Sequence, residues 1–289
     1  MDTYKYNKLK GCFIGLAIGD ALGVPLEFHK RDELGHVQDM IGKGPFDLKP
    51  GEWTDDTSMA LCITDSLIHQ HKFDANDIMK NFVQWWQTGF MSHNGKCFDI
   101  GRTTQVALDN FIKTGDPYAG SGNEFSAGNG SIMRLAPIPI FFNDNRDNCI
   151  NFSVLQSKLT HNAPQCIDIV TKMSSLLFDL YDNKQWHDLI DVNSYTTKNR
   201  NDVKSTGYVI DTYDAAIWAI CNTNNFEDAL ILAVNLADDS DTVGAVTGQL
   251  AGAIYGYSSI PERWLSKLVW KDKLETMFDE LLNASTTPR

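Results

Sequence analysis

One stretch near the C-terminal end of the chain constrains the fold strongly, because it sets acidic side chains inside an apolar run. Residues 236–244 read LADDSDTVG, with three carboxylates in four positions. No Lys or Arg lies between Glu227 and Pro261 to offset them. Burying like charges this close together costs several kcal/mol unless a positive charge neutralises them. The stretch therefore needs either a bound cation or a start of a helix that keeps the acids near water.

Two explanations stay open for these acids. Carboxylate and hydroxyl oxygens are the ligands that Mg²⁺, Ca²⁺ and Mn²⁺ prefer, so one explanation is a hard divalent cation. The other is a capped helix start, with Asp239 or Ser240 as N-cap and Asp241 in the first turn. A cap uses one acid, and the stretch offers three.

A second acidic motif, far away in the sequence, has the same chemistry. Thr54, Asp55 and Asp56 stand at the beginning of an apolar-periodic segment that runs to Ile68, which is a typical helix start. N-capping by Thr54 or Asp55 would explain part of the pattern. A hydroxyl followed by acids at two helix starts also predicts that the two starts face each other and share cations.

Glycines recur every fourth residue in two segments of the chain. The first set is followed by Glu27, which lies just past the expected helix end at Pro25, and Asp20 interrupts its apolar surface. Such spacing gives a helix one smooth side where a neighbour can approach closely. We expect the two segments to pack against each other at the centre of the molecule. The glycines are Gly11, Gly15, Gly19 and Gly23 in one segment, and Gly244, Gly248, Gly252 and Gly256 in the other.

The remaining pattern predicts an all-α protein. Apolar residues recur at helical spacing in many segments, and no strand-like alternation persists. No linker or internal repeat divides the chain, so residues 1–289 are predicted to form a single domain. The segment 132–142 is apolar and is predicted to be a helix.

Composition narrows the functional classes. The net charge of −12 argues against a nucleic-acid-binding protein. The six cysteines are scattered, which indicates buried thiols in a reducing compartment. Neither a signal peptide nor an uncharged run of transmembrane length is found, so we expect a cytoplasmic protein without a membrane partner.

A small-residue loop precedes the apolar segment 132–142. It reads SAGNGS over residues 126–131. Such a loop leading into a helix N-terminus offers backbone N–H groups to an anion such as phosphate, although many Gly/Asn loops are simply turns. His161 lies in another short loop and is either an ordinary loop histidine or a hydrogen-bond donor to a phosphate group.

Five motifs appear in a fixed order along the chain. They are GDALG at residues 19–23 with Glu27, WTDDT at 53–57, GNGSIMR at 128–134, TH at 160–161 and DSDT at 239–242. Together they resemble the ADP-ribosylglycohydrolase family, in its bacterial branch, over about residues 8–270. The resemblance implies an all-α, multi-helix orthogonal bundle with a binuclear centre of two Mg²⁺ or Mn²⁺ ions.

The resemblance also implies roles for individual residues. Asp241 is expected to bridge both ions, and Asp238 and Ala237 depart from the family, which often has glycine before the second acidic motif. The implied metal ligands are Thr54, Asp55, Asp56, Asp239, Asp241 and Thr242. The implied catalytic acids are Glu27, Asp99 and Asp55. The implied contacts to the diphosphate and the distal ribose of ADP-ribose are Ser126, Gly128, Asn129, Gly130 and His161.

The implied activity is metal-dependent hydrolysis of the bond between ribose and a modified protein side chain, with ADP-ribosyl-arginine as the favoured substrate. Its partners would be the ADP-ribosylated protein and ADP-ribose. Two alternatives use the same fold. One is a non-catalytic protein; the other is an immunity or regulatory protein that binds ADP-ribose or an ADP-ribosyltransferase, with the loops 29–52 and 182–208 as contact surfaces.

Overall fold

The chain folds into helices joined by long loops. The computed structural model describes residues 2–286, and within them thirteen α-helices and no β-sheet are found, which confirms the all-α prediction. The helices are α1 (Thr3–Gly23), α2 (Asp55–Gln70), α3 (Ala75–Thr88), α4 (Arg102–Thr114), α5 (Pro137–Phe141), α6 (Arg146–Lys158), α7 (Pro164–Tyr181), α8 (Val192–Thr196), α9 (Val209–Cys221), α10 (Phe226–Val234), α11 (Ser240–Tyr255), α12 (Glu262–Leu265) and α13 (Lys271–Ser285).

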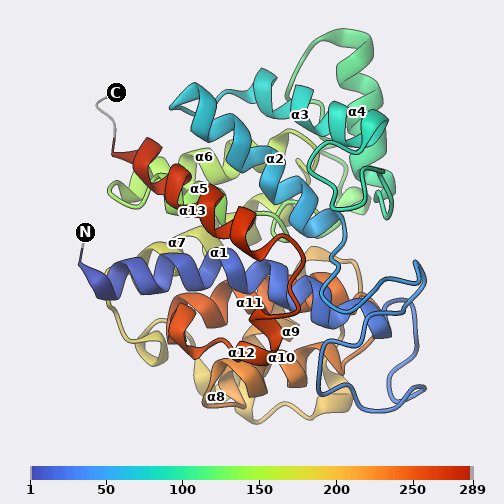
Figure 1. The fold of residues 1–289 in the computed structure, drawn as a ribbon, viewed down its shortest axis with the longest axis vertical. Coiled ribbons are helices and arrows are strands. Elements are labelled where there is room, and N and C mark those ends of the chain that lie inside the picture. The colour runs from blue at the N-terminus through green and yellow to red at the C-terminus, as the bar shows by residue number, and fades with distance from the viewer. Residues whose placement is uncertain (1, 287–289) are drawn as a thin grey trace.

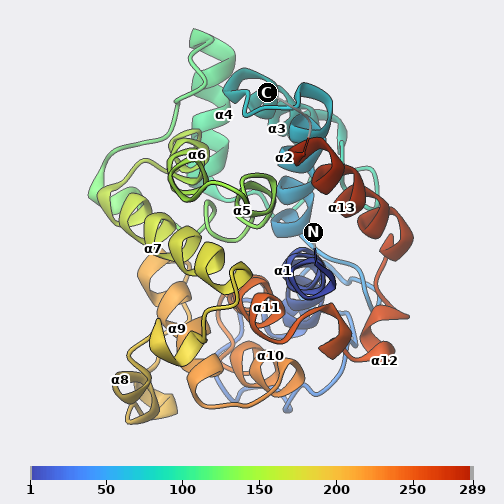
Figure 2. The same ribbon diagram turned by 90° about the vertical axis from the view of Figure 1, so that its left-hand side faces the viewer.

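Helices α1 and α11 form the centre of the fold. In Figure 1 α1 crosses the middle of the molecule, with α2, α3 and α4 on one side and α8, α9, α10 and α12 on the other. Figure 2 looks nearly along α1 and shows α11 beside it, with other helices around the pair. One contiguous hydrophobic cluster includes residues from Leu9 to Ala284.

The two glycine series face each other, as the spacing predicts. A Cβ atom on Gly15 would lie 2.2 Å from the carbonyl oxygen of Gly248, and one on Gly19 would lie 1.9 Å from that of Gly244. Only hydrogen at these positions lets the backbones approach this closely. The pairing runs antiparallel, since Gly11 meets Gly252. It places the C-terminal end of α1 beside the N-terminal end of α11.

The apolar length of α1 is buried. The segment Thr3–Leu26 is long and apolar enough to cross a membrane. Its most apolar window has a mean hydropathy of 1.5, and 94% of that window is buried inside the structure. Its apolar surface therefore serves the protein core.

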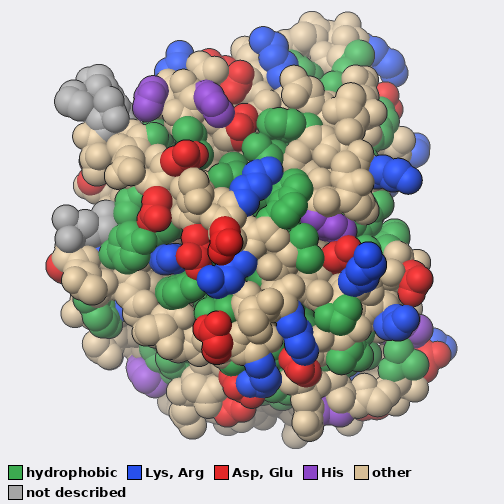
Figure 3. All heavy atoms as spheres, in the orientation of Figure 1, with side chains coloured by type: hydrophobic (Ala, Val, Ile, Leu, Met, Phe, Trp, Pro, Cys, Tyr) green, Lys and Arg blue, Asp and Glu red, His purple; other side chains and the backbone are tan. Residues whose placement is uncertain are grey.

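The six cysteines carry free thiols, and five of them are buried. On the face drawn in Figure 3, acidic and basic side chains are interspersed.

Candidate metal-binding active site

The first acidic motif begins α2, and a carboxylate of α1 caps it. Asp20 is fully buried. Its Oδ1 accepts hydrogen bonds from Thr54 N at 2.9 Å and Thr54 Oγ1 at 3.0 Å, and its Oδ2 accepts from Thr57 N at 3.0 Å and Thr57 Oγ1 at 2.6 Å. Thr54 is the N-cap residue as predicted, but its side chain makes no capping hydrogen bond, because Asp20 satisfies the N–H groups of Thr54 and Thr57. Side-chain capping therefore does not explain why Asp55 and Asp56 stand at this helix start.

The second acidic motif begins α11 in a different way. Asp239 is the N-cap residue but its side chain accepts no capping hydrogen bond. The two residues before it, Ala237 and Asp238, have left-handed backbones with φ of 61° and 66°. A short parallel bridge holds them, in which Phe28 N donates to Asp238 O at 2.7 Å and Asp238 N donates to His29 O at 2.9 Å. The bridge brings Glu27 next to the start of α11.

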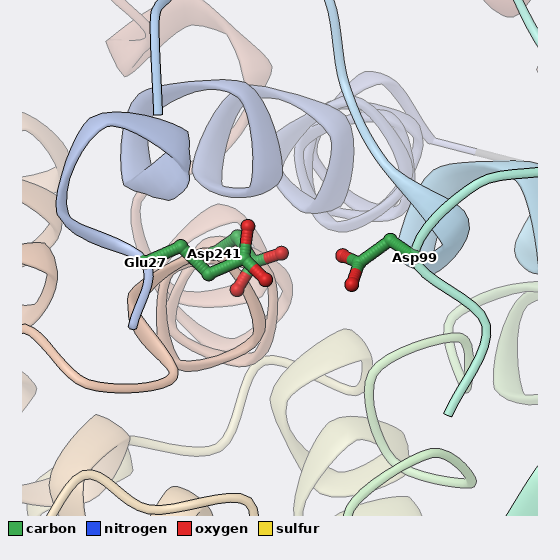
Figure 4. Close-up of side chains that lie close together, drawn as sticks. All are labelled: Glu27, Asp99 and Asp241. Atoms are coloured by element: carbon green, nitrogen blue, oxygen red, sulfur yellow. The ribbon is translucent and has the colours of Figure 1, made fainter. Parts of the chain in front are cut away.

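The two helix starts converge. Thr54 Oγ1 lies 3.2 Å from Asp241 Oδ2 and 3.4 Å from Asp56 Oδ2, and Thr242 Oγ1 lies 3.4 Å from the same Asp56 oxygen. Carboxylate oxygens of Glu27, Asp99 and Asp241 lie within 4.8 Å of one another. Figure 4 shows Glu27 and Asp241 on one side, with Asp99 pointing toward them from the opposite loop.

Several oxygens of this cluster lack a partner. Glu27 Oε2, Asp56 Oδ1 and Asp241 Oδ1 are buried and accept no hydrogen bond within the described residues. Buried acceptors without donors are costly, and these three lie at one place. An oxygen-only set of carboxylates and hydroxyls matches the preference of Mg²⁺ and Mn²⁺, so the residues present fit the expected metal centre.

The cluster also suppresses its own ionisation. Burial, followed by the negative charge of Asp99, raises the pKa of Glu27 to about 9. Burial and the charge of Asp239 raise the pKa of Asp99 to about 7. Burial and neighbouring acids likewise raise the pKa values of Asp55, Asp56 and Asp241 well above the usual range. A divalent cation would reverse this tendency and favour the ionised carboxylates.

Most of the residues singled out from the sequence line one cleft of about 350 Å³. Thr54 and Asp56 are buried and do not line it, but Thr54 contacts Asp241, which does. Ser126 lies apart, in an adjoining hollow of about 650 Å³. The predicted residues that line the cleft are Glu27, Asp55, Asp99, Gly128, Asn129, Gly130, His161, Asp239, Asp241 and Thr242.

The glycine loop does not lead into a helix, and this part of the prediction is wrong. Residues 130–134 form turns and α5 begins only at Pro137. Pro137 and Pro139 have no N–H group, so a helix starting at Ile132 would lose two of its backbone hydrogen bonds. Gln249 Nε2 satisfies the carbonyl groups of Ile132 and Met133 instead, at 3.0 and 2.9 Å.

The glycines of this loop make room for a histidine ring. A Cβ atom on Gly130 would lie 2.5 Å from His161 Cε1, and one on Gly128 would lie 3.2 Å from His161 Nε2. Between them, Asn129 Nδ2 donates to Asp239 Oδ2 at 2.7 Å and to Thr212 Oγ1 at 2.9 Å. The loop therefore contacts both His161 and Asp239 and helps to fix the position of each.

Some lining residues were missed at the sequence level. The helix that begins at the cleft is α4, whose first turn contributes Arg102, Thr103 and Thr104 and whose N-cap, Gly101, provides no side-chain cap. In the adjoining hollow, Phe125 is 90% exposed and Tyr208 is 37% exposed. The sequence predicts a helix over residues 103–114, and α4 confirms it, but nothing in its periodicity indicates that its first turn lines the cleft. The two aromatic residues gave no signal either.

The fold and the cleft define an all-α protein that gathers buried carboxylates from two helix starts beneath a polar opening. The model of the ADP-ribosylglycohydrolase family matches residues 1–289, and the chain belongs to this family. It is 44% identical to ADP-ribosylarginine hydrolase Tri1 of Serratia proteamaculans, over 97% of this chain and 80% of that protein. It is 30% identical to the ADP-ribosyl-[dinitrogen reductase] glycohydrolase of Rhodospirillum rubrum, over 93% of each.

A solved structure with the same fold is similar as well. A protein described as an ADP-ribosylglycohydrolase-related protein complex superposes with a TM-score of 0.83 at 34% identity, covering 99% of this chain and 100% of that one. The expected family and the expected fold class are thus both confirmed.

Proposed function

We propose that this protein is a metal-dependent hydrolase that removes ADP-ribose from modified protein side chains, with arginine as the preferred linkage. The observation that carries the proposal is the set of unpartnered buried oxygens of Glu27, Asp56 and Asp241 where the two acidic helix starts meet. The relatives named as ADP-ribosylarginine hydrolases, at 44% and 42% identity, support the choice of linkage.

Two Mg²⁺ or Mn²⁺ ions would be held by Thr54, Asp55, Asp56, Asp239, Asp241 and Thr242. When bound, such ions supply Lewis acidity to the ribose hydroxyls and to a water molecule. The protein's own contribution is to hold these ligands rigidly, through Asp20 at the first helix start and Asn129 at Asp239.

The reaction breaks the bond between the anomeric carbon and the arginine nitrogen, with water oxygen forming the new bond to carbon. The leaving nitrogen gains a proton. Glu27 and Asp99 face the cleft and are the groups proposed to hold or move this proton. Their carboxylates also suit a guanidinium group, whose fixed N–H donors pair well with carboxylate oxygens. A serine linkage would not use this complementarity.

The diphosphate of ADP-ribose would lie against His161 and the first turn of α4, because that turn lines the cleft and no side chain caps its N-terminus. The exposed rings of Phe125 and Tyr208 in the adjoining hollow offer apolar surface for the base. Ser126 lies in that hollow too, so we keep it as a substrate contact.

One assay tests the proposal. The protein is incubated with Mg²⁺ and matched peptides that carry ADP-ribose on arginine or on serine, and free ADP-ribose is measured. Release from the arginine peptide that stops with EDTA and resumes with added Mg²⁺ is expected. No release from either peptide, with binding of ADP-ribose retained, would instead favour a non-catalytic or regulatory role on this fold.

A further inference from the structure

A buried arginine lies behind the cleft without a carboxylate partner. Arg134 is fully buried, and no Asp or Glu of the described chain lies within ion-pair distance of it. Its guanidinium donates from Nη2 to Thr160 Oγ1 at 2.6 Å and from Nε to Gln156 Oε1 at 3.3 Å, and lies 4.5 Å from the Phe82 ring centre. The charge of Asp55 acts on Arg134 only from beyond ion-pair distance, and burial still lowers the pKa of the guanidinium. Burying a cation without a direct ion pair is costly, so the hydrogen-bond partners of Arg134 indicate its use.

The bond to Thr160 fixes the direction of the next hydrogen bond. Arginine is a donor only, so Thr160 Oγ1 must accept from Arg134. The hydroxyl has one proton of its own to donate. His161 Nδ1 lies 2.8 Å from Thr160 Oγ1, and it is the second partner of this oxygen within the described residues. If Nδ1 carried a proton, the buried hydroxyl proton would be left without an acceptor, which is unfavourable.

The His161 ring carries a single proton. Burial and the positive charge of Arg134 lower the pKa of His161 to about 3, so the imidazole is neutral at physiological pH. Because Nδ1 accepts from Thr160, that one proton belongs on Nε2.

The Nε2 edge of the ring faces the glycine loop. Cβ atoms on Gly128 and Gly130 would lie 3.2 and 3.0 Å from His161 Nε2, and His161 lines the cleft. The main chain of His161 is held as well, since its N donates to Ser157 O at 2.6 Å and its O accepts from Ser157 Oγ at 2.7 Å. The ring therefore has a fixed position.

We infer that Arg134 and Thr160 act as positioning residues that hold His161 in its Nε2–H tautomer, so that the cleft presents one oriented N–H donor to an anion. The identity of that anion as the diphosphate of ADP-ribose rests on the proposed function. The assignment of the Nε2–H tautomer does not depend on the proposed function. With Nδ1–H instead, an unprotonated Nε2 would face the anion with its lone pair.

The tautomer can be measured directly. Protein labelled with ¹⁵N-histidine, in Mg²⁺, gives two-bond ¹H–¹⁵N spectra that distinguish Nε2–H from Nδ1–H for each of the seven histidines. The His161 signals are assigned by their loss in His161→Gln. Wild-type protein is expected to show Nε2–H. An Nδ1–H signal, or an imidazolium at pH 7, would overturn the inference whether or not the protein has hydrolase activity.

Variants then test the hydroxyl of Thr160. Thr160→Val removes the hydroxyl and is expected to give a mixture of tautomers, with ADP-ribose binding weakened about tenfold in calorimetry. Thr160→Ser should restore both. Thr64→Val is the matched control, because Thr64 is also fully buried with its hydroxyl bonded to a helix carbonyl, Ala60 O at 2.8 Å, and it lies outside the cleft. A Thr160→Val protein with pure Nε2–H and unchanged affinity would refute the role of the hydroxyl.

Discussion

The two acidic helix starts carry similar side chains but are supported in different ways. The start of α2 is held by Asp20, a rigid helix residue whose two oxygens accept four hydrogen bonds. The start of α11 has no side-chain cap and follows two left-handed residues, Ala237 and Asp238. Loops hold it instead, through the bridge to Glu27 and the bond from Asn129 to Asp239.

The comparison teaches that similar motifs can divide the work of a site. At α2, the carboxylate of Asp20 caps the helix start from α1 and keeps it in regular geometry. The acids at the start of α2 are therefore not needed as caps. Strained backbone turns the other start toward the same point, at a cost in free energy. We therefore expect substitutions near α2 to affect ligand geometry more strongly, and substitutions before α11 to affect mainly stability.

The largest effect is expected for Asp241, which the two starts share. Asp241→Ala should lower kcat/KM for the arginine-linked substrate by about 10³-fold, because a central metal ligand is lost. Calorimetry should show much weaker Mg²⁺ binding. The metal-free variant should melt no lower than metal-free wild type, since one repelling carboxylate is removed. Wild-type turnover in this variant would contradict the proposed metal centre.

Asp20→Asn tests the support of the first start. An amide nitrogen would then face an N–H donor of Thr54 or Thr57, so we expect a loss of about 2 kcal/mol in stability with Mg²⁺ present. Activity should fall roughly 10–100-fold through displaced ligands.

Asp74→Asn is the control for Asp20→Asn, because Asp74 caps α3, with Asp77 N donating to its Oδ1 at 3.0 Å, outside the cleft. It should leave activity unchanged. Equal losses of activity in the two variants would show that general destabilisation, rather than ligand placement, is responsible.

The acid cluster predicts how pH acts on the metal-free protein. The pKa of Glu27 is raised from 4.5 to about 9 and that of Asp99 from 3.8 to about 7. For each group, the folded state therefore binds more protons than the unfolded state at any pH between its two pKa values. Stability should therefore fall as pH rises, by about 4 kcal/mol between pH 6 and 8. Chemical denaturation in EDTA measures this slope.

Saturating Mg²⁺ should flatten or reverse the slope, because the ions favour ionised carboxylates and bind the folded state. Identical pH profiles with EDTA and with Mg²⁺ would contradict a metal bound at this cluster.

The smallest effect is expected in the strained turn before α11. Asp238→Gly relieves a left-handed backbone at an exposed residue and should stabilise the protein by about 0.5 kcal/mol, after the entropic cost of glycine in the unfolded state. Gly95→Ala is the reverse control: Gly95 has φ of 70° and open space around it, so the protein should lose about 1 kcal/mol of stability. A destabilised Asp238→Gly would show that the turn is not strained.

Sequence patterns anticipated much of the fold because glycine spacing and helical periodicity are local signals. They predicted that Gly15 would meet Gly248 at the centre, and the close approach of their backbones confirms it. They also predicted that the two acidic motifs would meet. The cap from Asp20 was missed, because one acid on an apolar helix gives no sign of which N–H groups it will satisfy 34 residues away.

Arg134 and the segment after Gly130 show where local signals fail. The apolar run favoured a helix from Ile132, but two prolines and the carbonyl contacts to Gln249 decided its shape. Arg134 was part of a motif, yet its link to His161 through Thr160 depends on packing between separate segments. Such partners follow from the three-dimensional arrangement.

The antiparallel glycine contact between α1 and α11 also sets what an engineer can change in this molecule. Ser240 Oγ donates to Gly23 O at 2.7 Å, so the seam ends directly at the acidic start of α11. One residue inserted between Gly11 and Gly23 would turn the remaining glycines about 100° away from α11 and shift Glu27 along the helix axis. The loops at 29–52 and 182–208 lie outside the seam. These segments can therefore be exchanged without disturbing the seam, while the length of α1 has to be treated as fixed.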